Sequence, residues 1–370
     1  MLAVTPVSVV IITQGRVPLV EALLCSLDEA RAELAATSEV LVVDDSRPSD
    51  AEALRRACSA HGARYVAAGS PSVSAKRNQG AGEAAFPVVL FLDSDCLATP
   101  PLLVEHARRY DDPAVHGVLG LLEFDGPGTE ACAAVDLTPF AGSFGWPREY
   151  ATVSWGPTAN LSVRAASFAA LGGFDETFPP RPGGEDVDLG LRLTARFGRL
   201  ACAPEARALH TRYTWNSFRG NLRRFFQWGV ADRYLVVRHP QRTFRDLPRL
   251  PVLAFTAAVA AMALAIVQGR PGWILAGLLV APLAAVIDGT RQLPSRGLRG
   301  VWRGTIAHAY FFANELGCLW AFARAGEVAV AGTRLHFGRN QQYGEWVDSG
   351  VRIRAVTIAW LVLVVMMNIW

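Results

Sequence analysis

The first 215 residues alternate short apolar runs with amphipathic stretches, and this alternation limits the possible fold more than any other feature of the chain. Apolar runs suited to strands occupy residues 7–12, 40–43, 64–67 and 88–92. Stretches with helical spacing lie between them, at residues 18–34, 49–60 and 74–84. Strands that alternate with helices predict an α/β domain with a parallel sheet covered on both faces. In such a sheet, ligands bind beyond the carboxyl ends of the strands.

Acidic residues directly follow two of the predicted strands. Asp44 and Asp45 follow the second run, and Asp93-Ser94-Asp95 follows the fourth. Two carboxylates at a strand end can hold Mg²⁺ or Mn²⁺, because these cations prefer oxygen ligands and keep positions open for phosphate oxygens. The first pair can also accept hydrogen bonds from a base or a ribose. A solvated turn or a helix N-cap gives the same local pattern.

A third acidic pair, Glu185-Asp186, follows two glycines, Gly183 and Gly184. Glycines let the backbone approach a ligand closely. The pair opens a predicted helix, Val187–Phe197, where negative charge near the N-terminus is favourable. Helix capping alone would also explain these two carboxylates.

Seven segments occur in the order typical of one family. They are V-V-I-I-T, V-V-D-D-S, S-A-K-R-N-Q-G, F-L-D-S-D, T-A-N-L-S-V-R, L-G-G-F-D-E and G-G-E-D-V-D-L-G-L-R-L. Together they resemble glycosyltransferase family 2, and the resemblance covers roughly residues 5–215. It implies a GT-A type, Rossmann-like catalytic domain that transfers sugar from a nucleotide-diphosphate donor.

The resemblance also implies roles for individual residues. Donor and nucleotide binding would fall to Thr13, Asp44, Asp45, Arg77 and Asp93. Asp95 would ligate Mg²⁺ or Mn²⁺. His210 sits where some relatives add a ligand, although an ordinary buried histidine is the alternative.

On the acceptor side, the resemblance implies that Asp186 is the general base and that Glu185 orients the acceptor. Asn160 and Gly184 would lie on the same side. A carboxylate can take the proton from an acceptor hydroxyl while the metal neutralises the departing diphosphate. Direct displacement of this kind inverts the anomeric carbon.

The acceptor itself stays open at this point. Processive synthases of the family carry Q-x-x-R-W, whereas this chain reads Arg224-Phe225-Phe226-Gln227-Trp228-Gly229, which argues against polymer synthesis. A hydroxyl acceptor, including a lipid-linked one, suits the Glu185-Asp186 pair. Mycofactocin-type peptide glycosyltransferases show similar G-E-D and D-S-D-C motifs, so a peptide or small metabolite is also open. The alternatives are a polyprenyl-phosphate glycosyltransferase and a non-catalytic membrane scaffold on the same fold.

Two uncharged apolar runs, Pro251–Val267 and Gly272–Ile287, are separated by a short turn. Each approaches the length of ~20 residues that crosses a bilayer, so they predict a transmembrane hairpin. A third run, Ala355–Trp370, ends the sequence. Thr305–Ala323 is ambiguous because it contains His308, Asn314 and Glu315, and an ionised Glu is costly in lipid.

Arginines flank the predicted hairpin on one side, which places that side in the cytosol. We therefore predict a catalytic domain at residues 1–215 that faces the cytosol, and a basic amphipathic interface helix with a linker at 216–250. An α-helical transmembrane region at 251–370 would then make the protein a multi-pass protein of the inner cell membrane, in contact with membrane lipid.

Composition excludes some other classes. The net charge of +3 does not indicate nucleic-acid binding. The six cysteines form no C-x-x-C pair and suggest buried reduced thiols instead of a zinc site or a disulfide framework. Lys76 is the only lysine, which we interpret as compositional bias.

Overall fold

The computed structural model describes residues 5–34, 36–138, 140–245, 249–327 and 332–337, together with 355 and 358. The chain divides into two compact units. The sheet unit comprises Met1–Pro127 and Gly142–Thr214, and the helical unit comprises Gly128–Ala141 and Trp215–Trp370. The segment Gly128–Ala141 therefore groups with the C-terminal part of the chain, which the sequence pattern does not indicate.

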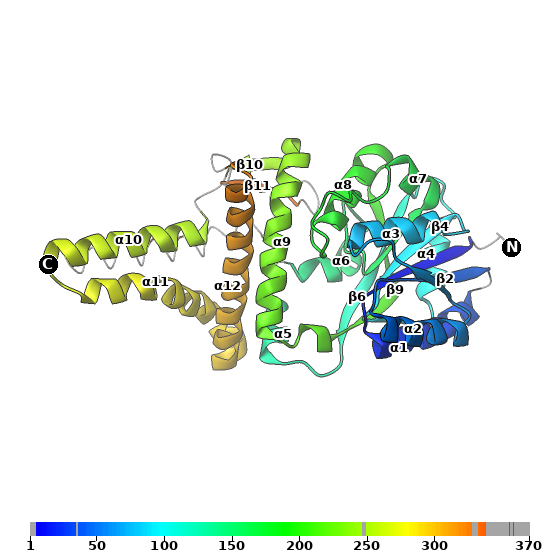
Figure 1. Cartoon of the computed structure of the whole chain (residues 1–370), viewed down its shortest axis with the longest axis horizontal. Helices are drawn as coiled ribbons and strands as arrows, with labels where there is room; N and C mark the ends of the chain where they lie inside the picture. Colours follow the sequence, from blue (N-terminus) through cyan, green and yellow to red (C-terminus); the bar gives the residue numbers. More distant parts are fainter. Residues whose placement is uncertain are drawn as a thin grey trace. The chain divides into compact units, whose positions relative to one another are not determined.

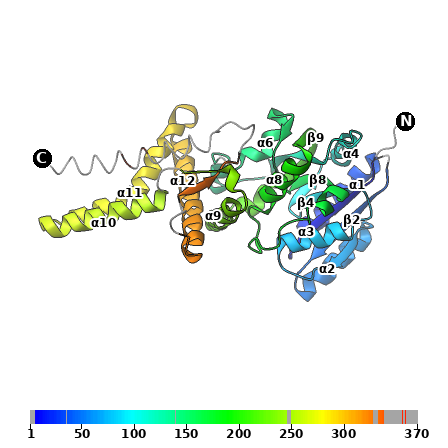
Figure 2. The ribbon, with the colours of Figure 1, turned by 90° about the horizontal axis from the view of Figure 1, so that it is seen from above.

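The sheet unit is built on one sheet (Figures 1 and 2). The strand order is β3-β2-β1-β4-β8-β6-β9-β5, and β7 pairs with β9. Its strands are β1 (Val7–Thr13), β2 (Ser38–Asp44), β3 (Arg64–Ala67), β4 (Val88–Asp93), β5 (Cys96–Ala98), β6 (Gly117–Asp125), β7 (Thr152–Val153), β8 (Asn160–Arg164) and β9 (Leu200–Thr211). The first four strands agree with the predicted runs. They pair in parallel, as predicted, and beyond them the sheet is mixed, because β8 runs antiparallel to both β4 and β6.

Helices cover both faces of this sheet. They are α1 (Val17–Glu33), α2 (Pro48–Ala60), α3 (Val73–Gly82), α4 (Leu102–Arg109), α6 (Gly142–Glu149), α7 (Ala165–Ala170) and α8 (Glu185–Phe197). Because side chains alternate along a strand, Val9 and Ile11 of β1 join a core with α1, α2 and α4. On the opposite face, Phe91 of β4 packs against the rings of Phe168 and Phe174.

The carboxyl ends of the parallel strands meet at one edge, as the alternation predicts. Thr13 of β1 lies opposite Asp44 of β2. Its neighbour Ile12 lies opposite Asp93 of β4. Both acidic pairs therefore project from the same edge of the sheet, where α/β sheets bind ligands.

The helical unit contains α5 (Glu130–Val135), α9 (Phe218–Arg238), α10 (Leu250–Gln268), α11 (Gly272–Gly289) and α12 (Leu293–Arg324), with a small pair of strands, β10 (Thr243–Arg245) and β11 (Thr333–Leu335). The short 3-10 turns are η1 (Arg212–Trp215), η2 (Pro240–Arg242) and η3 (Thr290–Gln292).

Helices α9 and α12 lie side by side and approach each other through glycines (Figure 1). A Cβ atom on Gly229 of α9 would lie 1.7 Å from the Asn314 carbonyl oxygen. One on Gly317 of α12 would lie 2.0 Å from the Phe226 carbonyl oxygen. Such distances leave no room for a side chain, so the glycines set the spacing of this helix pair.

Helices α10 and α11 form an antiparallel hairpin (Figure 1). In the described part of the chain, α10 and the helical stretch Gly272–Arg324 are long and apolar enough to cross a membrane. Much of the α10 surface is apolar and exposed, including Phe255 at 72% and Ile266 at 77%. The predicted run Ala355–Trp370, apart from residues 355 and 358, lies outside the described residues.

Glu315 of α12 is fully buried inside the helical unit. Its Oε2 atom accepts a hydrogen bond from the backbone N–H of Leu250, 2.5 Å away, at the start of α10. Its Oε1 atom is paired with the Arg334 guanidinium of β11. The carboxylate is thus held by protein groups, which removes the main objection to its lying in an apolar helix.

Candidate functional site

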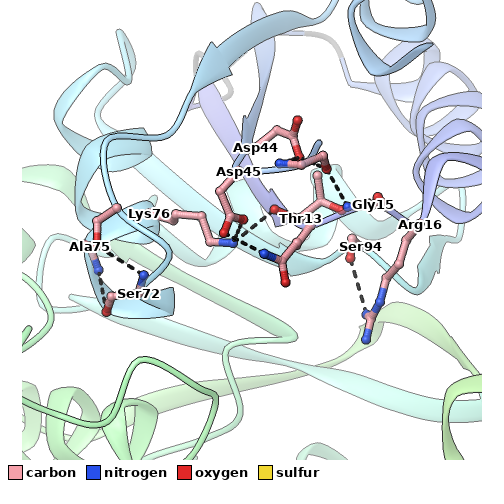
Figure 3. Close-up of polar contacts among 12 residues, drawn as sticks. Thr13, Gly15, Arg16, Asp44, Asp45, Ser72, Ala75, Lys76 and Ser94 are labelled. Atoms are coloured by element: carbon pink, nitrogen blue, oxygen red, sulfur yellow. Dashed lines mark hydrogen bonds and ion pairs between the residues drawn. The ribbon is translucent and has the colours of Figure 1, made fainter. Parts of the chain in front are cut away.

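The end of β2 carries two carboxylates with different surroundings (Figure 3). Asp44 is buried and accepts hydrogen bonds from the Ser46 N–H at 3.0 Å and the Tyr65 hydroxyl at 3.0 Å. Burial and this bond to Asp44 raise the pKa of Tyr65 to about 12, so the phenol keeps its proton. Asp45 lies nearer the surface, and its Oδ2 atom accepts from the Gln14 amide at 3.0 Å.

Lys76 of α3 joins the ends of β1 and β2 (Figure 3). Its Nζ atom lies 2.5 Å from Asp45 Oδ1 and donates to the Thr13 carbonyl oxygen at 3.0 Å. The side chain is only 4% exposed. Sequence reasoning missed this residue by assigning it to compositional bias, although its being the only lysine was a usable signal.

Arg77, the next residue of α3, links the end of β4 to the start of α8. Its Nη1 atom lies 2.8 Å from Glu185 Oε1, and its Nη2 atom lies 3.3 Å from Asp93 Oδ1. Burial alone would lower the pKa of Arg77, but the carboxylates of Glu185 and Asp93 outweigh it and raise the pKa. Glu185 also accepts from the Gly183 N–H at 2.6 Å, so both of its oxygens are engaged inside the protein. This geometry suits positioning better than contact with an acceptor.

Asp186 follows at the first turn of α8. Gly184 before it has φ +83°, a left-handed conformation that favours glycine and turns the chain into the helix. Asp186 Oδ1 accepts from the Val187 N–H at 2.8 Å. The side chain stays in contact with solvent, yet it lies deep among protein atoms. Burial, followed by the nearby charge of Glu185, raises the pKa of Asp186 to about 7, a value at which a carboxylate can exchange a proton near neutral pH.

Asp95 and His210 come together through strand pairing. Cys96 lies directly opposite His210 in the β5–β9 ladder, and His210 Nε2 is 3.5 Å from Asp95 Oδ1. All three side chains are buried, and their potential ligand atoms lie within 4.8 Å of one another. A carboxylate and an imidazole are a donor set that fits Mn²⁺ or a similar divalent ion. Burial raises the pKa of Cys96 well above its usual value, and a protonated thiol is a poor ligand for a hard cation.

Arg16 is a further residue at this edge that sequence reasoning missed. Its Nη1 atom lies 3.0 Å from Asp95 Oδ2 and 3.5 Å from Ser94 Oγ. It has φ +58°, and among the described residues it is the non-glycine residue with a positive φ. The side chain is 42% exposed, so its guanidinium could turn toward a phosphate. No motif marks Arg16; only the turn between β1 and α1 brings it to Asp95.

Asn160 lies at the same edge of the sheet, opposite Leu92 of β4, but its side chain turns into the core. Its side chain is fully buried in the sheet unit, where Oδ1 pairs with His106 Nε2 at 2.9 Å. Its Nδ2 atom donates to the carbonyl oxygens of Leu121 at 3.0 Å and Ala206 at 2.8 Å, where the β6–β9 register shifts. These bonds use its hydrogen-bonding capacity within the core, so its position argues against the acceptor-side role expected for it.

The cysteine expectation also needs correction. All six cysteines are free thiols, but Cys25 is exposed and not buried. Cys96 stands beside His210, which is distant in the sequence, because β5 and β9 pair across more than 100 residues of chain.

Comparison with known proteins places part of the chain among glycosyltransferases. The family described as glycosyl transferase family 2 matches residues 8–156. A pre-mycofactocin glycosyltransferase of Mycobacterium tuberculosis is 30% identical over 178 residues, which are 47% of this chain and 37% of that protein. A validoxylamine A glucosyltransferase of Streptomyces hygroscopicus is 34% identical over 149 residues, 33% of this chain and 35% of that protein. The chain thus matches little more than a third of either relative.

A solved structure shares the fold over most of the chain. A mannosyltransferase from Pyrobaculum calidifontis, in complex with GDP-Man and Mn²⁺, superposes with a TM-score of 0.53 at 19% sequence identity. The superposition covers 85% of this chain and 87% of that one. At this identity the similarity establishes the GT-A fold and not the substrate.

Proposed function

The N-terminal part of this chain belongs to glycosyltransferase family 2 and has a GT-A fold, and on this premise we propose that the protein is a metal-dependent, inverting glycosyltransferase. It would move a sugar from a nucleotide-diphosphate donor to a hydroxyl acceptor at the cytosolic face of a membrane. The observation that carries the proposal is the edge of the sheet, where Asp95 with His210 and the carboxylate Asp186 with its raised pKa both occur.

The metal-side residues would receive the donor diphosphate. Asp95 and His210 would hold Mg²⁺ or Mn²⁺, which supplies positive charge to the departing diphosphate when bound. Arg16 would move from Asp95 Oδ2 to a phosphate oxygen of the donor, since its guanidinium is partly exposed. Asp44 or Asp45, with Thr13, would bind the nucleoside at the neighbouring strand ends.

The acceptor-side residues would activate the hydroxyl. Asp186 would take the hydroxyl proton as the general base, because its raised pKa lets it bind a proton at neutral pH. Glu185 would fix Arg77, and through Arg77 the side chain of Asp93, with no direct contact to the acceptor. Attack from the side opposite the leaving diphosphate would invert the anomeric carbon.

The helical unit supports a location at a membrane. Large apolar side chains are exposed on both α10 and α11, among them Phe255, Ile266 and Leu278, and such surfaces suit contact with a membrane or a partner. Arg219 and Arg223 are exposed on α9, which would suit an anionic membrane surface. A lipid-linked hydroxyl acceptor would fit this location.

Donor hydrolysis and transfer test the proposal. We would incubate the detergent-solubilised full chain with a panel of nucleotide sugars and Mn²⁺, then add soluble alcohols, a lipid-linked hydroxyl acceptor or a polyprenyl phosphate. The proposal expects metal-dependent release of nucleotide diphosphate that a hydroxyl acceptor increases. If only polyprenyl phosphate increases this release, the acceptor is a phosphate and not a hydroxyl. Failure to bind any nucleotide diphosphate with Mn²⁺ would favour a non-catalytic scaffold.

A further inference from the structure

We infer that Lys76 is a positioning residue that prepares Asp45 to bind the nucleoside of the donor, and that arginine cannot replace it. The inference rests on the proposed function, because it assumes a nucleotide donor at this edge. It assigns a role to a residue that touches neither the proposed metal nor the proposed base.

The sequence gives the first reason. The chain contains 36 lysine and arginine residues, and Lys76 is the only lysine. A composition so biased toward arginine would place arginine here too, unless the position demands a different cation. The adjacent Arg77 shows the contrast, because there a guanidinium spans two carboxylates, Glu185 and Asp93. A fork of five donors suits that arrangement, whereas a compact ammonium suits an enclosed point site.

The geometry gives the second reason. The Lys76 ammonium contacts Asp45 Oδ1 and the Thr13 carbonyl oxygen, and its side chain is only 4% exposed. Figure 3 shows the ammonium between the ends of β1 and β2. A guanidinium would bring extra N–H groups and a wider plane into this space. It would have to push Thr13 and Asp45 apart or leave buried donors without acceptors.

The third reason is that the two carboxylate oxygens of Asp45 have different partners. Lys76 holds Oδ1 of Asp45, while Oδ2 faces the Gln14 amide in an exposed contact. The Lys76 contact fixes the orientation of the carboxylate and leaves the second oxygen on the outer side. The outer oxygen can then exchange the Gln14 amide for an N–H of a base or an O–H of a ribose. Asp44 is less suited to this role because Ser46 and Tyr65 already bind it in the interior.

The test measures nucleotide affinity in the detergent-solubilised full chain. UDP and GDP, each with Mn²⁺, are titrated into the wild type, Lys76→Arg, Lys76→Met, Asp45→Asn and the double variant Lys76→Met/Asp45→Asn. Arg56→Met on α2 is the control for charge removal, because Arg56 is 69% exposed and lies outside the site. Mn²⁺ binding and thermal unfolding are measured on every variant.

We expect Lys76→Met and Lys76→Arg each to weaken binding of the preferred nucleotide by about 10- to 100-fold, as for loss of a charged hydrogen bond. Mn²⁺ affinity should change less than about twofold, because the Asp95 and His210 pair is not altered. The double variant should bind as weakly as Asp45→Asn alone, since one interaction is removed twice. A merely structural lysine would instead lower thermal stability and Mn²⁺ affinity together.

The single lysine offers a direct readout. In protein labelled with [ε-¹³C]lysine, one side-chain resonance is expected, and the nucleotide should shift it in the wild type but not in Asp45→Asn. The inference is overturned if both Lys76 variants bind nucleotide within about twofold of the wild type while Asp45→Asn does not. If the wild type itself binds neither nucleotide with Mn²⁺, the proposed function fails instead.

Discussion

Asp186 has a raised pKa and lies at the start of α8, and its substitution tests the proposed general base directly. Asp186→Asn preserves the shape of the side chain and removes the proton acceptor. We expect transfer to fall by about 10²–10⁴-fold, the usual contribution of a general base. Nucleotide binding should change little, because Asp186 is on the acceptor side. An equal loss of nucleotide affinity, measured by titration, would indicate a structural role.

The same carboxylate predicts a pH dependence. Its pKa is raised from 3.8 to about 7 in the folded protein, so the folded state binds more protons than the unfolded state between these values. Stability should therefore fall as pH rises through this window, while the base becomes active as pH approaches and passes 7. A pH–rate profile should show an acidic limb near pH 7. Asp186→Asn should abolish that limb and flatten the unfolding curve with pH; a limb that persists would assign the titration to another group.

Asp95 and His210, the two proposed metal ligands, should differ in their effect on metal binding. Asp95→Asn should abolish Mn²⁺ binding and sugar transfer, because it removes the charged ligand and leaves the amide beside His210. His210→Gln should weaken metal binding less, since the charged ligand Asp95 remains. Isothermal titration with Mn²⁺ tests this, with circular dichroism to show that the fold is kept. Full activity of Asp95→Asn, or of the wild type in excess EDTA, would contradict a metal role.

At the scale of elements, the packing of α9 on α12 predicts a sensitive pair of positions. Gly229→Ala or Gly317→Ala would place a methyl group within about 2 Å of a backbone carbonyl of the facing helix, so the helices must separate. We expect the free energy of unfolding to fall by about 1–3 kcal/mol or more, as for overpacking of a well-filled interface. Gly145→Ala in α6, where φ is not positive and an added Cβ meets no atom within 4 Å, measures the backbone effect of the same substitution in a helix. Thermal unfolding of the three variants in detergent would separate the two effects.

Local sequence patterns predicted the first four strands but not the contacts that side chains make between elements. The runs that became β1 to β4 follow directly from hydrophobic periodicity, and their shared edge follows from parallel pairing. Asn160 lies in a motif of the right order, yet its environment depends on where β6 and β9 shift register. Likewise Lys76 gains its partners only when α3 is laid beside β1 and β2. Such long-range pairings leave no periodic trace in the sequence.

For the whole molecule, the β10–β11 pair bears on how the chain crosses a membrane. Thr243 precedes the predicted hairpin and pairs with Leu335, which follows α12. Residues 243 and 335 must therefore lie on the same side of any bilayer. If α10 and α11 cross as a hairpin, α12 begins on that side and returns to it, so it does not span. Its packing along α9 and the pairing of Glu315 with protein groups are consistent with this path.

Cysteine labelling tests this topology in intact cells. In a Cys25→Ser background, Arg270→Cys should react with a membrane-impermeant maleimide, because it lies in the turn between α10 and α11. Arg296→Cys and Gly332→Cys, both at exposed positions, should react only after permeabilisation, because Arg296 lies near the start of α12 and Gly332 follows its end, both on the cytosolic side. Labelling of Gly332→Cys from outside would mean that α12 crosses the membrane and that the β10–β11 pair cannot form in the cell. If all three cysteines react only after permeabilisation, the hairpin does not cross the membrane. It would then lie on the membrane, with its exposed apolar face buried in one leaflet.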